Sequence, residues 1–101
     1  MQTAQLKDIF SVLTNIIKED KVRPITDLVE IRAENGIAQI ACTDNRTALV
    51  VDIEEEDDIP RTVVSLSLLA KLVKMTTKEE VKFKKHERYL EMKGDGKYKL
   101  P

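Results

Sequence analysis

Four polar residues near the middle of the chain have side chains and a spacing that could bind an anion. Ser67, Lys71, Lys74 and Lys78 follow one another at intervals of four, three and four residues. This spacing would place them along one side of a helix, provided that the helix reaches Lys78. A row of ammonium groups attracts phosphates without reading a base sequence, and salt weakens the attraction. A solvated helix face has the same appearance, so both interpretations stay open.

The other residues capable of chemistry have simpler structural explanations. Cys42 alternates with Ala38 and Ile40 on one apolar strand face, which indicates a buried thiol rather than a nucleophile. His86 stands in a predicted turn, where we expect a solvated imidazole. One cysteine and one histidine in the whole chain exclude an intrachain disulfide and the familiar Cys/His zinc sites.

Two segments resemble binding motifs only incompletely. The acidic run 54–58 lacks the spaced oxygen ligands and the turn glycine of an EF-hand loop. Its like charges repel one another, which predicts an exposed connection. The segment Gly94-Asp95-Gly96-Lys97 is not followed by the helix of a phosphate-binding loop, so it indicates a hairpin turn. We therefore expect no catalytic residue, no cofactor and no metal ion.

The composition is typical of one soluble domain. Of 101 residues, 42% are hydrophobic and 35% are charged, which suits one compact core and leaves no room for a second. No apolar run approaches the roughly 20 residues that cross a bilayer, and no signal segment opens the chain. We therefore expect a cytoplasmic protein. The net charge of −1 conceals an acidic segment, 43–60, and a basic segment, 67–85.

Two predicted helices must position the basic residues. Apolar residues recur every three or four positions from Thr3 to Lys18, with Thr3 as the candidate N-cap, and again from about Ser65 to Thr76. The inward stripe of the second helix is predicted to be Leu68, Leu69, Leu72 and Val73. Alternating apolar residues predict strands near 28–33, 38–42, 48–53, 62–64, 81–83, 90–92 and 98–100. Consecutive apolar residues at 49–51 suggest that the third strand is covered on both faces.

Each half of the sequence thus has a helix followed by a three-stranded antiparallel meander, which predicts an α+β fold. If both helices pack on one face of the sheets, their outer sides form one basic surface. Lys7 and Lys18 of the first helix would extend the row of the second helix.

Several strings, in this order, resemble the N-terminal domain of the bacterial sliding clamp, the β subunit of DNA polymerase III. They are Arg23-Pro24-Ile25-Thr26-Asp27-Leu28-Val29-Glu30-Ile31, Glu34-Asn35-Gly36, Ala41-Cys42-Thr43-Asp44, Val63-Val64 with Leu68-Leu69 and Leu72-Val73-Lys74-Met75, and Lys93-Gly94-Asp95-Gly96-Lys97-Tyr98-Lys99-Leu100-Pro101. The resemblance covers nearly the whole chain and depends on the order and spacing of the strings. It implies a DNA clamp-like domain, with two helix-plus-antiparallel-meander repeats and both helices on one face.

The resemblance also implies a function without catalysis. Sliding clamps are polymerase processivity factors that self-associate in a ring around duplex DNA, with helices lining the hole and basic residues facing the DNA backbone. Their partners are a DNA polymerase and the clamp loader. By position, Lys74 and Arg23 match basic residues of the family, whereas Lys7, Lys18, Lys71 and Lys78 are candidate DNA contacts from helical geometry alone. Tyr98 and Leu100 match the strand that meets the next protomer, with plain core packing as the alternative.

Two departures from the family and two other functions stay open. The family has a strand before its first helix, for which only residues 1–3 remain, and three domains in each chain. We therefore expect residues 1–101 to form one clamp-like domain, either the N-terminal domain of a longer three-domain chain or a reduced relative, which does not encircle DNA alone. A protein-interaction module that adds a partner strand at an exposed sheet edge is one alternative. A small hydrolase using Asp44 and His86 is the other.

Overall fold

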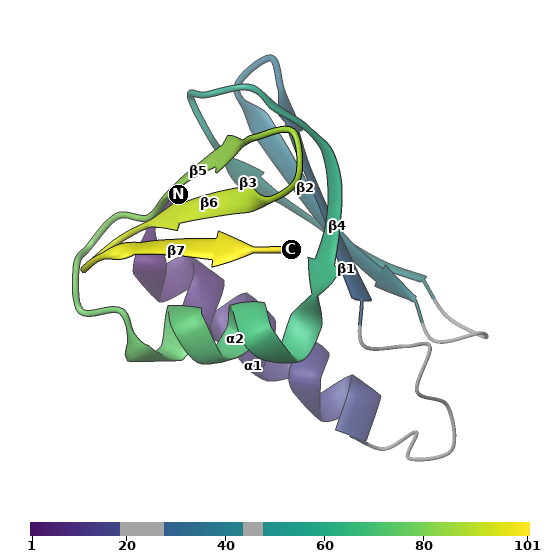
Figure 1. Ribbon diagram of the computed structural model, residues 1–101. Helices are drawn as coiled ribbons and strands as arrows, with labels where there is room; N and C mark the ends of the chain where they lie inside the picture. The colour runs from purple at the N-terminus through teal and green to yellow at the C-terminus, as the bar shows by residue number, and fades with distance from the viewer. Residues whose placement is uncertain (19–27, 44–47) are drawn as a thin grey trace.

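The structure is a computed structural model that describes residues 1–18, 28–43 and 48–101. In these described residues, a first helix is followed by four strands and a second helix by three (Figure 1). The elements are α1 (Thr3–Lys18), β1 (Leu28–Glu34), β2 (Ile37–Thr43), β3 (Ala48–Glu54), β4 (Ile59–Ser65), α2 (Leu66–Met75), β5 (Lys82–Lys85), β6 (Leu90–Lys93) and β7 (Lys97–Leu100). The predicted elements are therefore confirmed in type and order.

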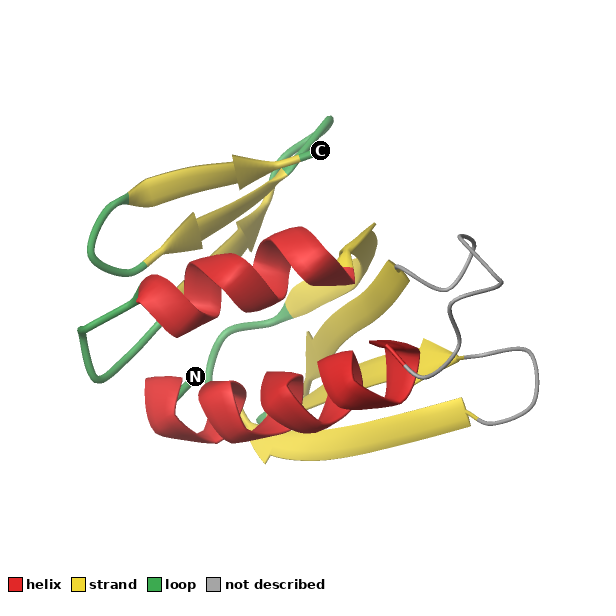
Figure 2. Cartoon of the chain, turned by 90° about the horizontal axis from the view of Figure 1, so that it is seen from below, coloured by secondary structure: helices red, strands yellow, loops and turns green. Residues whose placement is uncertain are grey.

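The strands form two antiparallel sheets, and both helices pack on the same side of them. The larger sheet has the order β3-β2-β1-β4, and the smaller has the order β5-β6-β7. Seen from below in Figure 2, α1 and α2 lie side by side in front of the strands, and the two helices are in contact. The predicted α+β arrangement, with both helices on one face, is confirmed.

One hydrophobic core lies between the helices and the sheets. The helices contribute their 3.6-residue stripes and the strands contribute alternate residues, because those are the positions that face one side of each element. Fully buried members include Leu6, Leu13, Val29, Ile31, Ile40, Leu66, Leu69, Val73, Leu90, Met92 and Leu100. Each such side chain stabilises the fold by about 1.5–3 kcal/mol relative to exposure to water.

The start of α2 turns a different set of residues inward from the set that the sequence predicts. Ser65 caps the helix, since its Oγ accepts a hydrogen bond from the Leu68 N–H at 3.3 Å. The helix begins at Leu66, which is buried, as are Leu69 and Val73, while Leu68 is 38% exposed. The prediction that Leu68 belongs to the inward stripe was therefore wrong. The buried stripe consists of Leu66, Leu69 and Val73, which are spaced by three and four residues, and Leu68 lies outside it.

Two other local predictions were also wrong. Val50 is 57% exposed, so β3 is covered on one face only among the residues that the structure describes. Thr3 is the first residue of α1 rather than its cap, and its buried Oγ1 has no hydrogen-bond partner. The Leu6 N–H donates instead to the Gln2 carbonyl at 3.1 Å.

The first residues of the chain pair with the segment before β5. The Val81 N–H donates to the Met1 carbonyl and the Thr3 N–H donates to the Glu79 carbonyl, both at 2.8 Å, and Gln2 bridges Glu80. Where the resemblance implies a strand before the first helix, the described residues therefore form one isolated bridge. Asn35 and Gly36, with φ of 56° and 84°, close the β1–β2 hairpin as predicted.

The acidic run after β3 contains a buried carboxylate. Glu55 is only 8% exposed, and its Oε2 accepts a hydrogen bond from the Met1 ammonium at 2.8 Å. Its Oε1 accepts from the Asp57 N–H at 3.1 Å, and the same ammonium donates to the Val81 carbonyl at 2.8 Å. The prediction of an exposed acidic connection therefore holds for residues 54 and 56–58 but was wrong for Glu55.

Candidate nucleic-acid interface

A groove between α1 and α2 brings three of the predicted basic residues together. Lys7 of α1 and Lys71 and Lys74 of α2 line it, together with Ser11, Thr14, Asn15 and Ser67 at the rim and Phe10, Leu66, Ala70 and Val73 at its floor. The lysines are exposed, whereas Phe10, Leu66 and Val73 belong to the core. No acidic side chain is among the described residues that line this groove. The basic helix surface that the sequence predicts is therefore present, with Lys7, Lys71 and Lys74 as its cations.

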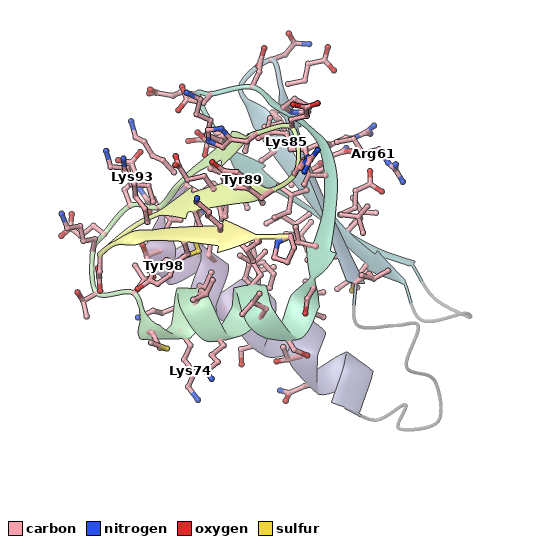
Figure 3. All side chains as sticks on the ribbon, in the orientation of Figure 1. Arg61, Lys74, Lys85, Tyr89, Lys93 and Tyr98 are labelled. Carbon is pink, nitrogen blue, oxygen red and sulfur yellow. The ribbon has the colours of Figure 1, made fainter. Side chains whose placement is uncertain are left out.

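The helix periods explain why these side chains point outward. In α1, Lys7 and Ser11 are four residues apart and alternate with the buried Leu6, Phe10 and Leu13. In α2, Lys71 lies between the buried Leu69 and Val73 in the sequence, and Lys74 follows Val73; at about 100° per residue, both lysines point away from the buried side of the helix. Lys74 points away from α2 at the bottom of Figure 3, on the side away from the sheets. Long flexible ammonium groups in such positions can follow a phosphate backbone without tight, directed contacts.

Lys78 does not belong to this surface. Helix α2 ends at Met75, and Thr76 has an extended backbone with φ −74° and ψ 129°. Lys78 instead lines a second depression, beside the N-terminus and the acidic residues 54–57, which shares only Lys7 with the groove. The predicted row of three lysines on one helix is thus wrong at its last position.

The side chain of Asp95, in the β6–β7 turn, holds the backbone after α2 out of a helical conformation. Its carboxylate accepts hydrogen bonds from the Thr77 N–H at 2.9 and 3.1 Å, from the Thr77 hydroxyl at 2.9 Å and from the Lys78 N–H at 2.9 Å. The Thr76 N–H and hydroxyl close the last turn of the helix, donating to the carbonyls of Val73 and Leu72. These contacts give the physical reason why the polar stripe of α2 stops before Lys78.

The same hydrogen bonds lower the pKa of Asp95 below its ordinary value of 3.8. The Thr77 N–H contributes most to this pKa shift, and the Lys78 N–H follows. A carboxylate with a lowered folded-state pKa stabilises the fold above its unfolded-state pKa, and this contribution is lost as the pH falls through the folded-state value. The turn that positions Lys78 is therefore sensitive to acid.

We expect Asp95→Asn to lower the melting temperature at pH 7 by a few degrees, because an amide has only one acceptor oxygen for these donors. The difference from the unaltered protein should shrink as the pH falls below about 3.8 and the aspartate itself becomes protonated. Thermal unfolding followed by circular dichroism between neutral and acidic pH measures both effects. Asp58→Asn, in the exposed part of the acidic run, is the control. An equal melting-temperature difference at every pH would contradict the role given to the carboxylate.

Three predicted site residues cannot be compared with the structure. The side chain of Lys18, and Arg23 and Asp44 altogether, lie outside the residues that the structure describes. The proposed Asp44–His86 pair is therefore untested. Cys42 is 5% exposed, which confirms the predicted buried thiol.

His86 is not the solvated turn residue that the sequence predicts. Its ring stacks on Tyr89 with centroids 4.6 Å apart. Its Nε2 is buried without a hydrogen-bond partner and lies 3.7 Å from Oε1 of Glu91. The backbone explains this position, since the His86 N–H donates to the Tyr89 carbonyl at 2.9 Å and closes a tight turn that brings the rings together.

Tyr98 and Leu100, the predicted protomer contacts, lie on the last strand of the smaller sheet. Leu100 is fully buried in this chain's own core, and Tyr98 is half-buried against it. Among the described strands β7 pairs only with β6, so its second edge is open. Core packing therefore accounts for Leu100 within this chain, and the edge beside it is where another chain could add.

Sequence reasoning missed a second group of cations, on the outer face of the smaller sheet. Lys82 and Lys84 of β5, Lys93 of β6 and Lys97 and Lys99 of β7 are all exposed. The alternation of lysine with apolar residues in Lys-Phe-Lys, Glu-Met-Lys and Lys-Tyr-Lys-Leu is the signal that could have revealed this face. Taken one at a time, the sequences of β5, β6 and β7 indicate ordinary half-buried strands. Only the pairing of the three strands brings their lysines together.

The fold matches solved sliding clamps. Neither protein-family models nor curated proteins match the sequence. The Helicobacter pylori beta clamp bound to a DNA ligase peptide aligns with 100% of this chain and 29% of its own, at a TM-score of 0.84 and 10% identity. The Thermotoga maritima DNA polymerase III beta subunit aligns with 99% of this chain and 28% of its own, at 0.81 and 20%. The Pseudomonas aeruginosa subunit gives the same coverage, at 0.80 and 18%.

These matches confirm the predicted resemblance at the level of the fold, which is that of a bacterial sliding-clamp domain. The chain spans only 28–29% of the length of the clamp chains that it matches. No helix in residues 1–18, 28–43 and 48–101 is long and apolar enough to span a membrane.

Proposed function

We propose that this chain is a sliding-clamp domain, which has no catalytic activity and contributes a basic, sequence-independent surface to a ring around duplex DNA. The observation that carries the proposal is the groove between α1 and α2. Its cations, Lys7, Lys71 and Lys74, come from both helices and have no acidic neighbour in the groove. A duplex lying against this face would be attracted by its phosphates alone, which leaves the DNA free to slide.

The proposed ring requires more than one such domain. One domain of this fold covers 28–29% of a clamp chain, so we propose that residues 1–101 act as the N-terminal domain of a larger chain or assembly. The open edge of β7, next to Tyr98, and the open edge of β3 are where neighbouring domains would continue the sheets. Tyr98 would be the more accessible contact, because Leu100 is already fully buried.

The proposed partners follow from the same function. A DNA polymerase would be held on its template by the ring, and a clamp loader would open the ring and place it on DNA. The Helicobacter pylori beta clamp is bound to a DNA ligase peptide. A processivity factor of this kind would act in the cytoplasm, where bacterial DNA is replicated. The alternative of a strand-adding interaction module uses the same open edges, but it gives no reason for the basic helix groove.

We expect the triple variant Lys7→Glu, Lys71→Glu and Lys74→Glu to lose affinity for duplex DNA. Three lost phosphate contacts should reduce the slope of log affinity against log salt by about 3. Fluorescence anisotropy with a labelled duplex of about 20 base pairs, at about 20–200 mM NaCl, measures both quantities. In a polymerase assay with the assembled ring, the same variant should shorten the product.

Lys78→Glu is the matched control, because the sequence places this lysine in the same stripe whereas the structure places it in another depression. Affinity and salt slope should change little in this variant. If the triple variant binds duplex DNA as the unaltered chain does, with the same salt slope and product length, the helix groove has no role in DNA binding. The strand-adding module would then be the better interpretation.

A further inference from the structure

The outer face of the β5-β6-β7 sheet is strongly basic. We define the lysine face as the exposed residues Lys82, Lys84, Lys93, Lys97 and Lys99. They alternate along the strands with Phe83, Met92, Tyr98 and Leu100, which face the core. Glu91 is the one acidic residue that shares this side of the described strands. The lysines therefore form one positively charged patch on the outer face of the smaller sheet.

One row of this face places three like charges next to one another. Lys82 pairs with Lys93, and Lys93 pairs with Lys97. Residues directly opposite in an antiparallel pair have Cβ atoms about 4.5–5.5 Å apart, and like charges in these positions are destabilising. No ion pair joins these three lysines to a carboxylate in the part of the chain that the structure describes. The row thus costs stability in the free protein, and a bound polyanion would relieve the repulsion.

The neighbouring row combines charge with aromatic rings. Lys84 pairs with Glu91, and Glu91 pairs with Lys99. The Lys99 Nζ lies 5.1 Å from the centre of the Tyr89 ring, against which His86 stacks. Both rings are half-buried beside the lysines. Lysines with adjacent aromatic rings are the combination by which proteins bind single-stranded nucleic acids, since the lysines take the backbone and the rings take the bases.

The lysine face is separate from the helix groove. In Figure 3, Lys93 and Tyr89 lie by the smaller sheet in the upper part of the view, whereas Lys74 points downward from α2. No residue of the lysine face lines the helix groove, although Lys82 and Lys7 line the same neighbouring depression. Lys93 and Lys97 line neither of these depressions, so the lysine face would take a ligand of its own.

We infer that the outer face of β5-β6-β7 binds single-stranded nucleic acid, with Lys82, Lys93 and Lys97 on its phosphates and a base taking the place of the Lys99 ammonium over the Tyr89 ring. An acidic peptide would satisfy the lysines but would make no use of the aromatic surface, which is why nucleic acid is the ligand favoured here. This binding goes beyond the proposed clamp function and does not depend on it, since none of its residues lines the helix groove.

The test compares two triple variants of the 101-residue chain. Lys82→Glu with Lys93→Glu and Lys97→Glu should weaken binding of a labelled single-stranded DNA of about 20 nucleotides at least tenfold, and should lower the salt slope by about 2. The helix variant, Lys7→Glu with Lys71→Glu and Lys74→Glu, carries the same change of charge and should leave this binding nearly unchanged. Fluorescence anisotropy at about 20–200 mM NaCl gives both quantities. Circular dichroism checks that both variants are folded.

Two single variants probe the parts of the lysine face separately. Tyr89→Ala should weaken single-stranded DNA binding at least about fivefold with an unchanged salt slope, because it removes stacking and no charge. Lys93→Glu should raise the melting temperature by a few degrees, since it converts two repulsive pairs into attractive ones, while it weakens binding.

Four outcomes would overturn the inference. They are no measurable binding of the unaltered chain to single-stranded DNA at the lowest salt, equal binding by the sheet variant and the unaltered chain, no loss of affinity in Tyr89→Ala, and tighter binding of a labelled poly-glutamate peptide than of DNA. The last outcome would reassign the surface to an acidic protein. The helix variant tests duplex binding by the groove, and the sheet variant tests single-stranded DNA binding by the lysine face. If only the helix variant loses duplex binding, the clamp proposal is supported whatever happens to single-stranded DNA binding, so the two proposals can fail independently.

Discussion

Replacing Glu55 by alanine should lower the free energy of unfolding by about 3–5 kcal/mol, the usual cost of removing one partner of a buried ion pair. The Met1 ammonium and the Glu55 carboxylate are 2.8 Å apart, and their side chains are 0% and 5% exposed. Alanine would leave the ammonium buried with the Val81 carbonyl as its remaining partner, and would also leave the Asp57 N–H without its acceptor. Urea unfolding followed by circular dichroism measures the loss.

Glu55→Gln separates the charge from the shape of the side chain. Its amide oxygen can still accept a hydrogen bond and its volume is unchanged, so the loss should be smaller than for alanine. Glu56→Ala, at the exposed neighbouring position, is the control and should change the stability by no more than about 0.5 kcal/mol. A Glu55→Ala variant as stable as Glu56→Ala would mean that the carboxylate does not support the fold. Because a domain of this size is stable by only about 5–15 kcal/mol, the expected loss would be easy to detect.

Glu55 also illustrates where sequence reasoning fails. Five consecutive acids repel one another, so local charge density predicts that all of them are exposed. The partner that makes burial of one of them favourable is 54 residues away in the chain, and only the folded arrangement of the N-terminus, β3 and the segment before β5 brings the two together. The same limitation applies to Asp95, whose hydrogen-bond partners are 17 and 18 residues away and end the stripe of α2 before Lys78.

Patterns that repeat within one element were predicted well. Apart from Thr3, which is the first residue of the helix and not its cap, the extent of α1 was predicted correctly, because six apolar residues at intervals of three and four fix both its period and its buried side. The basic surface shared by Lys7, Lys71 and Lys74 follows from two such periods and from the packing of both helices on one face. The lysine face required the register of three strands, which the sequence leaves undetermined, because no string identifies which lysines stand opposite one another.

Leu69→Ala should destabilise the domain by about 2–5 kcal/mol, whereas Leu68→Ala should cost less than about 1 kcal/mol. Leu69 is fully buried between α2 and the sheets, and Leu68 is 38% exposed. Alanine at position 69 would therefore leave a cavity in the core, while at position 68 it would remove a side chain that already contacts water. Alanine favours the helix at least as well as leucine does, so propensity does not explain a difference between the two variants.

This pair of variants decides which side of α2 faces the core, and hence where its lysines point. The sequence predicts that both leucines face inward, which would give nearly equal losses. A helix that begins at Leu66, after its Ser65 cap, requires unequal losses. Since Lys71 and Lys74 point away from the side of α2 that buries Leu66, Leu69 and Val73, a helix rotated far enough to bury Leu68 in place of Leu69 would turn one of these lysines toward α1 or the sheets. Equal losses in urea unfolding would thus contradict both the register of α2 and the helix groove that the proposed DNA contact requires.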